Sequence, residues 1–113
     1  MNWIPFATDS QLANIKANVN YSIVFKHSTR CSISTMAKKK FELDWDDLPA
    51  NTQLYFLDLL SYRSLSSSIA NAFSVQHQSP QVLLIKNGEC VLEQSHGDIS
   101  VEEINEVIEK TNI

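Results

Sequence analysis

Residues 21–31 read Tyr-Ser-Ile-Val-Phe-Lys-His-Ser-Thr-Arg-Cys, and this stretch decides how the rest of the chain is interpreted. Its first six residues are mostly β-branched or aromatic, which is typical of a largely buried strand. Apolar residues follow at helical spacing and would share one inward face, namely Ile33, Met36, Ala37 and Phe41. We therefore expect a buried strand that leads directly into a helix, with Cys31 in the first turn of that helix.

Helices and strands alternate in the remainder of the chain. Apolar or β-branched runs predict further strands at 53–60, 81–85 and 90–94. Further helices are expected to begin at Asp9 or Ser10, among Ser64, Ser66 and Ser67, and at Ser100, where Glu103 completes a capping-box sequence. Asn87-Gly88 predicts a tight hairpin turn of type I′.

This order of elements predicts one α/β domain over residues 1–113. The first two strands are each followed by a helix, which implies parallel pairing, while the hairpin adds antiparallel strands. We expect a four-stranded mixed sheet with helices on both faces. The apolar segment at residues 1–8 is expected to pack onto this body as an arm.

Composition narrows the possible functions. The 113 residues are 43% hydrophobic and 19% charged, as in an ordinary globular domain. A net charge of −4 argues against binding to nucleic acid or to an anionic membrane. The only glycines are Gly88 and Gly97, so no glycine-rich nucleotide loop can be built.

Cysteine and histidine spacing points away from a metal site. Cys31 and Cys90 are far apart in the sequence, and the three histidines add no ligand spacing, so we expect no bound metal. There is neither a long apolar run nor a signal-peptide pattern at the N-terminus. We therefore expect a cytoplasmic protein whose two cysteines are free thiols.

Cys31 is the strongest candidate for chemistry. It follows the carboxyl end of a buried strand, where open α/β sheets bind their ligands. The N-terminus of a helix offers unpaired N–H groups and partial positive charge, which stabilise a thiolate relative to a thiol. A thiolate is the nucleophile of thiol–disulfide exchange, and Arg30 would add a second positive charge. The alternative is that Cys31 is a small apolar residue of the core.

The order strand-Cys31-helix, strand-helix, Ser79-Pro80-strand, hairpin and helix resembles the thioredoxin fold over nearly the whole chain. In that fold, a cis-proline at the start of the third strand faces the active-site cysteine, which implies a cis bond before Pro80. Residues 25–34 and 77–81 more narrowly resemble the monothiol bacilliredoxins. These are bacterial proteins that act on mixed disulfides of the small thiol bacillithiol. The resemblance implies S-bacillithiolated client proteins as partners and bacillithiol as co-substrate, with no bound cofactor.

Ser34 occupies the position of the second cysteine in the dithiol C-x-x-C pattern. Its hydroxyl can hydrogen-bond the Cys31 thiolate but cannot form a disulfide with it. A mixed disulfide on Cys31 must therefore be resolved by a thiol from outside the protein. The sequence from Cys31 to Ser34 also lacks the Gly-Phe of glutaredoxin C-G-F-S motifs, which disfavours iron–sulfur cluster binding.

Other candidates surround Cys31, and each has a structural alternative. His27 could orient the thiolate or could pack beneath the loop, and Thr29, with Ser28, could contact substrate or cap the helix. Arg30 could bind the carboxylates of bacillithiol or could be a solvated surface residue. Ser79 could pair its backbone with an extended substrate beside Pro80.

Two further interpretations stay open at this point. A non-catalytic thioredoxin-fold module could hold a peptide in the groove beside Pro80, with Cys31 incidental to its function. An arsenate-reductase-like or cluster-binding role is a weaker third possibility. In each interpretation, Cys90 is expected to be a half-buried structural thiol.

Overall fold

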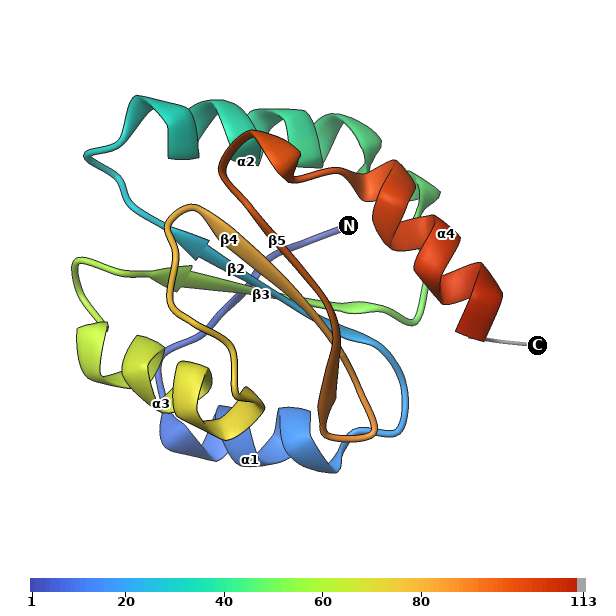
Figure 1. The fold of residues 1–113 in the computed structure, drawn as a ribbon, viewed down its shortest axis with the longest axis horizontal. Helices are drawn as coiled ribbons and strands as arrows, with labels where there is room; N and C mark the ends of the chain where they lie inside the picture. Colours follow the sequence, from blue (N-terminus) through green and yellow to red (C-terminus); the bar gives the residue numbers. More distant parts are fainter. Residues whose placement is uncertain (112–113) are drawn as a thin grey trace.

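The computed structural model describes residues 1–111, in which helices and strands alternate (Figure 1). In chain order the elements are β1 (Ile4–Pro5), α1 (Asp9–Ala17), β2 (Ser22–His27), α2 (Ser32–Asp44), η1 (Trp45–Asp47), β3 (Gln53–Asp58), α3 (Arg63–Phe73), β4 (Gln81–Lys86), β5 (Glu89–Ser95), η2 (His96–Asp98) and α4 (Val101–Thr111), η1 and η2 being 3-10 turns. Residues 112–113 of the predicted domain lie outside the described residues. Within residues 1–111, no helix is long and apolar enough to cross a membrane.

Within the described residues the sheet has five strands, in the order β1-β3-β2-β4-β5, so the predicted number of four is wrong. β1, β3 and β2 run parallel, whereas β4 is antiparallel to β2 and β5 to β4. The additional strand is β1, whose Ile4 and Pro5 pair with Tyr55 and Phe56 at the sheet edge. Two residues carry no alternating pattern from which a strand could be predicted, and an edge strand tolerates proline.

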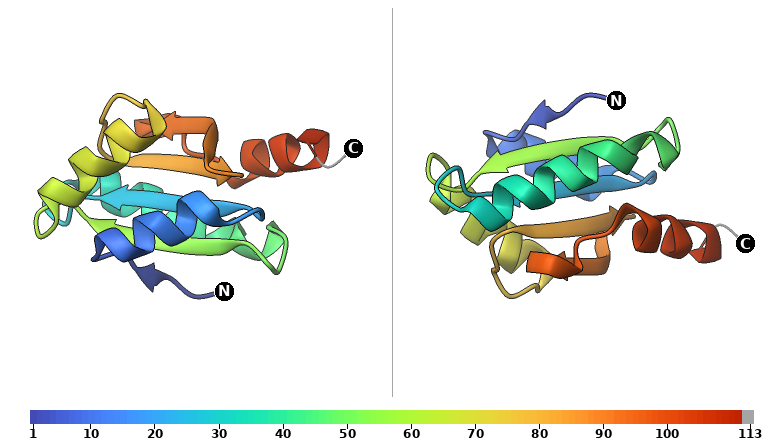
Figure 2. Two further views of the ribbon diagram at one scale, coloured as in Figure 1. Left: turned by 90° about the horizontal axis from the view of Figure 1, so that it is seen from below. Right: turned by 90° about the horizontal axis from the view of Figure 1, so that it is seen from above.

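β2 is the central strand, and all 6 of its residues are buried. Helices α1 and α3 cover one face of the sheet and α2 and α4 the other (Figures 1 and 2). Because successive strand side chains point to opposite faces, Val24 joins the core with Ile69 of α3, while Phe25 joins the core with Phe41 of α2. The strand ends at His27, where the chain turns toward α2, and this turn builds the site.

The N-terminal segment packs onto the body, as the sequence predicted. The Trp3 ring lies 5.6 Å from Phe25, 5.4 Å from Phe41, 5.3 Å from Trp45 and 5.6 Å from Phe56, between ring centroids. The Trp3 indole N–H also donates to the Glu42 carboxylate at 2.7 Å. This aromatic cluster fixes α2 against the sheet, and therefore also fixes the start of α2.

The inward face of α2 was predicted correctly at Ala37 and Phe41 and wrongly at Ile33 and Met36. Ile33 and Met36 are 55% and 70% exposed, while Ser34 and Phe41 are buried. The inward stripe runs through Ser34, Ala37 and Phe41, at spacings of three and four. Hydrophobicity alone favoured Ile33 over Ser34 as the buried residue. The structure buries the serine because its hydroxyl has a partner beneath the helix.

The hairpin turn was predicted correctly, because Asn87 and Gly88 both have positive φ, 54° and 77°. The helix starts were predicted less well. α1 is capped by Thr8, whose side chain and that of Gln11 form a capping box, rather than by Asp9 or Ser10. α3 begins after Tyr62 without any side-chain cap. At α4, the expected cap is present, since Glu103 N–H donates to Ser100 Oγ at 3.3 Å.

Candidate functional site

Cys31 lies at the N-cap of α2, directly after the loop that follows β2. Its backbone is extended, with φ −108° and ψ 117°, and its carbonyl accepts the first helical hydrogen bond from Thr35 N–H at 3.1 Å. Cys31 N–H donates to Ser28 O at 3.2 Å, which closes the loop into a turn. Cys31 is half-buried, and no side chain caps α2. The first N–H groups of a helix have no partner within the helix, so unpaired donors and the positive end of the helix dipole lie at this position.

The Ser34 hydroxyl makes different contacts from those the sequence suggested. Ser34 is fully buried, accepts a hydrogen bond from Ser28 N–H at 3.1 Å, and lies 2.6 Å from His27 Nδ1. Burial lowers the pKa of His27 below its ordinary value, and the charge of Lys38 lowers it further, so the ring is neutral near pH 7. Nδ1 and the Ser34 hydroxyl therefore share a hydrogen bond between two neutral groups. Among residues 1–111, no hydrogen bond joins Ser34 to Cys31, so the expected contact with the thiolate is absent.

His27 is part of the packing beneath the loop rather than an exposed ligand. It is 6% exposed, and its ring centroid lies 5.2 Å from Phe56 and 6.4 Å from Phe25. Through Ser34 it is linked to the backbone of Ser28. The structural alternative for His27 therefore fits the geometry: the residue holds the 28–34 segment in place and does not reach a bound substrate directly.

Thr29 and Arg30 are both exposed on the loop before Cys31. The cap expected from Ser28 or Thr29 is not formed, because Cys31 itself occupies the N-cap and α2 has no side-chain cap. Arg30 forms no salt bridge with any carboxylate of the described residues. Both side chains therefore remain available to a molecule that approaches Cys31.

The peptide bond between Ser79 and Pro80 is cis, as the resemblance implied. Pro80 is buried, and its loop lies at the same end of the sheet as the start of α2 (Figure 1). Ser79 Oγ is buried without a hydrogen-bond partner among the described residues. Ser28 and Ser79 line a common cavity of about 300 Å³, so the Cys31 loop and the cis-proline loop meet there.

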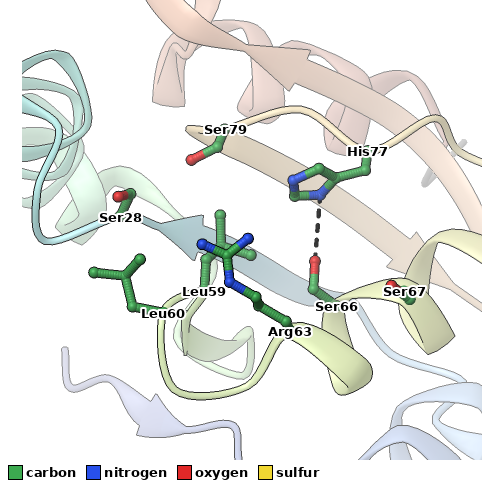
Figure 3. Close-up of a pocket in the computed structure, with 8 residues that line it drawn as sticks. All are labelled: Ser28, Leu59, Leu60, Arg63, Ser66, Ser67, His77 and Ser79. Atoms are coloured by element: carbon green, nitrogen blue, oxygen red, sulfur yellow. Dashed lines mark hydrogen bonds between the residues drawn. The ribbon is translucent and has the colours of Figure 1, made fainter.

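This cavity is bounded by three segments that are distant in the sequence (Figure 3). Its lining residues come from the Cys31 loop, from the β3–α3 turn with the start of α3, and from the loop before β4: Ser28, Leu59, Leu60, Arg63, Ser66, Ser67, His77 and Ser79. Arg63 and Asp58 lie close together in the sequence but form no salt bridge. Asp58 instead accepts hydrogen bonds from Leu60 N–H at 3.1 Å and Ser61 Oγ at 3.1 Å. No local motif could have placed Arg63 beside Ser79.

Cys90 is a structural thiol remote from this site. It pairs with Ile85 across the β4–β5 hairpin, and Ile85 in turn pairs with Ser22 at the start of β2. Cys31 follows the other end of β2, so the two sulfurs are separated by a strand length of about 20 Å. Burial raises the pKa of the Cys90 thiol to about 11, and its S–H donates to Leu92 O at 3.3 Å. Within residues 1–111, no group of three His, Cys, Asp or Glu side chains could hold a metal ion.

The mixed sheet with a cysteine at the start of α2 and a cis-proline before β4 defines a thioredoxin-fold protein, in which the position after Cys31 that could hold a second cysteine is Ser34. One solved structure, described as a proposed oxidoreductase with a thioredoxin fold, is 31% identical and has a TM-score of 0.81, covering 94% of this chain and 93% of that chain. The thioredoxin of Trypanosoma brucei brucei has a TM-score of 0.78 at 10% identity, covering 98% of this chain and 91% of its own. The thioredoxin of Malassezia sympodialis has a TM-score of 0.72 at 14% identity, covering 96% and 90%. These last two show the fold alone.

The family model of the monothiol bacilliredoxin BrxC matches residues 4–104. The chain belongs to this family. The family and the 31% identical neighbour together support a thiol redox protein and an oxidoreductase role in general. The match covers Cys31, Ser34, the cis bond before Pro80 and every residue that lines the cavity beside them.

Proposed function

We propose that the protein is a monothiol thiol–disulfide oxidoreductase that removes bacillithiol from S-bacillithiolated protein cysteines. The observation that carries the proposal is a half-buried cysteine at the N-cap of α2, with a serine in the position of a resolving cysteine. Cys90 cannot take over the resolving role, since it lies at the far end of the sheet. The chemistry therefore needs a second thiol that is not part of the chain.

The reaction proceeds by two thiol–disulfide exchanges. In the first, Cys31 thiolate attacks the bacillithiol sulfur of the mixed disulfide, a new S–S bond forms, and the client cysteine leaves as a thiolate that takes up a proton. In the second, the thiolate of a free bacillithiol attacks the adduct on Cys31. Bacillithiol disulfide is released, and Cys31 returns to its thiolate form. Each step breaks one S–S bond and forms one, so no net oxidant is required.

The surrounding residues have distinct roles in this scheme. The amides at the start of α2 stabilise the Cys31 thiolate each time it is released. Ser34 and His27 hold the loop, so Ser34 acts as a positioning residue rather than as a direct partner of sulfur. Ser79 and Pro80 shape the groove for the incoming disulfide, and exposed Arg30 and Thr29 border it. Such exchanges suit a reducing compartment, and we place the protein in the cytoplasm.

The test uses a bacillithiolated client protein and measures adduct mass on the wild type, Cys31→Ser and Cys90→Ser. We expect loss of the client adduct and a bacillithiol adduct on Cys31 in the wild type and in Cys90→Ser. Cys31→Ser should be inactive. A requirement for both cysteines would overturn the monothiol scheme. An unmodified Cys31 in an otherwise folded protein would favour the non-catalytic binding module.

A further inference from the structure

The cavity beside Cys31 collects hydrogen-bond donors and no carboxylate. Its polar lining consists of serines, Arg63 and His77, although the chain as a whole carries a net charge of −4. Figure 3 shows the Arg63 guanidinium reaching from the start of α3 into the middle of this cavity. Among residues 1–111, no carboxylate forms a salt bridge with Arg63. The cavity is therefore a positive pocket within an acidic protein, and its arginine is free to bind an external anion.

The His77 ring is oriented by two donors behind it. Its Nδ1 lies 3.4 Å from Lys26 Nζ and 3.3 Å from Ser66 Oγ. An ammonium group can only donate, so Nδ1 accepts and the ring proton resides on Nε2. Burial, then the charges of Lys26 and Arg63, lower the pKa of His77 and keep the ring neutral. In Figure 3 the second ring nitrogen points away from Ser66, on the side of Ser79, so Nε2 presents its N–H toward the cavity.

Lys26 contributes a positive charge beneath the cavity. It lies on the central strand and is fully buried, with Nζ 3.4 Å from Ser66 O. Glu93 is the acidic group that faces it, but no carboxylate of the described residues is close enough for a salt bridge with Lys26. An isolated buried charge is costly in free energy. An anion bound in the cavity would offset part of that cost.

Ser79 contributes a further hydroxyl to the cavity. Its Oγ is buried and has no partner in the part of the chain that the structure describes, yet the residue lines the cavity directly before the cis bond. Buried polar atoms are nearly always hydrogen-bonded in folded proteins. On the opposite wall, Ser28 is bonded through its carbonyl to Cys31 N–H at 3.2 Å. One wall of the cavity is therefore a residue that is hydrogen-bonded to Cys31, and the cavity contains a hydroxyl with no partner among the described residues.

We propose that this cavity is a subsite for a carboxylate of the small thiol that exchanges at Cys31, bound by Arg63, Ser79 Oγ and His77 Nε2–H, with Lys26 as the positioning residue. The inference rests on the proposed function, because it requires thiol exchange at Cys31. It assigns carboxylate recognition to α3 and the cis-proline loop, in place of the Arg30 contact expected from the sequence. A volume of about 300 Å³ accommodates a carboxylate together with the atoms that link it to sulfur.

The test compares two small disulfides of similar size, the dianionic 3,3′-dithiodipropionate and the neutral bis(2-hydroxyethyl) disulfide. Rates of mixed-disulfide formation on Cys31 are measured by mass spectrometry for the wild type, Arg63→Gln and Lys39→Gln. Lys39 is exposed on α2 and serves as a charge-matched control. We expect Arg63→Gln to lower the anionic-to-neutral rate ratio about tenfold, as loss of a charge-assisted hydrogen bond does, with the neutral rate unchanged. Lys39→Gln should keep the wild-type ratio.

The positioning role of Lys26 has its own readout. Burial lowers the pKa of Lys26 to about 8, so its charge is lost as the pH rises through that value. The anionic-to-neutral ratio of the wild type should fall across this range, while in Lys26→Met it should be low and independent of pH. Ionisation of Cys31 affects both disulfides alike and cancels in the ratio. The titratable or charged groups that face Lys26 are Glu93 and His77, and burial lowers the pKa of His77, so its ring is already neutral in this range.

Three results would overturn the subsite. The first is an equal rate ratio in wild type and Arg63→Gln, and the second is a ratio lowered to the same extent by Lys39→Gln. The third is a ratio that falls in Arg30→Gln while Arg63→Gln behaves as wild type, which would assign the carboxylate to Arg30. Failure of Cys31 to react with either disulfide would instead refute the proposed function, and the subsite with it.

Discussion

Replacing Lys26 by methionine should stabilise the protein at neutral pH, and the gain should disappear as the pH rises. Burial lowers the pKa of Lys26 from its ordinary value of 10.5 to about 8. Between these two values the unfolded state binds more protons than the folded state, so wild-type stability rises with pH. Below pH 8 both states are protonated, and the full cost of the buried charge is present. Methionine has a similar length and carries no charge.

The magnitude follows from that pKa difference. The gap between 10.5 and about 8, at about 1.4 kcal/mol per pH unit, corresponds to about 3 kcal/mol. Loss of the two long hydrogen bonds, to Ser66 O and His77 Nδ1, offsets about 1 kcal/mol. We therefore expect Lys26→Met to raise the free energy of unfolding by about 2 kcal/mol at neutral pH. The difference from wild type should vanish, or reverse slightly, near pH 10.5.

Urea denaturation followed by the fluorescence of Trp3 and Trp45 measures this difference at a series of pH values. Both cysteines titrate in wild type and variant alike, so their contributions cancel. Lys39→Met, at an exposed position of α2, is the matched control and should show no pH-dependent difference. A stability difference between wild type and Lys26→Met that stays constant from neutral pH to 10.5, or a variant that is less stable than wild type at neutral pH, would refute the reasoning.

Three further outcomes are expected. Near neutral pH, iodoacetamide should modify Cys31 and spare Cys90, because burial raises the pKa of the Cys90 thiol to about 11. Peptide mass spectrometry measures the labelling, and equal labelling of both cysteines would contradict this expectation. Gly88→Ala should lower the free energy of unfolding by about 1–2 kcal/mol, because Gly88 has φ 77° and an added Cβ would lie 2.8 Å from Lys16 O. Urea titration measures this change, and an unchanged free energy of unfolding would contradict the expectation. Thr8→Ala should lower the free energy of unfolding by about 1 kcal/mol in the same titration, because the side-chain cap of α1 is lost. Thr8→Ser keeps the hydroxyl and should be close to wild type, so an equal loss in both variants would exclude the capping explanation.

The sequence predicted the strand–cysteine–helix junction because its signals are local. A β-branched and aromatic run marks β2, and the Asn87-Gly88 pair matches a turn with two positive φ values. The cis bond before Pro80 and the thioredoxin fold came from the resemblance of the whole order of elements. Cys31 was placed within one residue of its observed position, at the N-cap instead of the first turn.

The predictions that failed depend on contacts between distant segments. β1 exists because two residues meet Tyr55 and Phe56 at an edge, and Ile33 is exposed because buried Ser34 finds His27 beneath the helix. Hydrophobicity cannot anticipate that a hydroxyl will be satisfied inside a core. It therefore placed Ile33 instead of Ser34 on the inward face of α2.

The order of amino acids alone identifies Cys31 as the candidate nucleophile and shows that Cys90 is too far along the chain to form a C-x-x-C pair with it, because both depend on residue identity and spacing. Which residues lie near the Cys31 loop depends on the tertiary structure. One cavity is lined by Arg63, His77 and Ser79, and Lys26 is buried beneath it in the central strand. These residues meet because β2 pairs in parallel with β3 and antiparallel with β4, which brings three loops to one end of the sheet. Separations of tens of residues become contacts in this way, and such contacts leave no periodic pattern in the sequence.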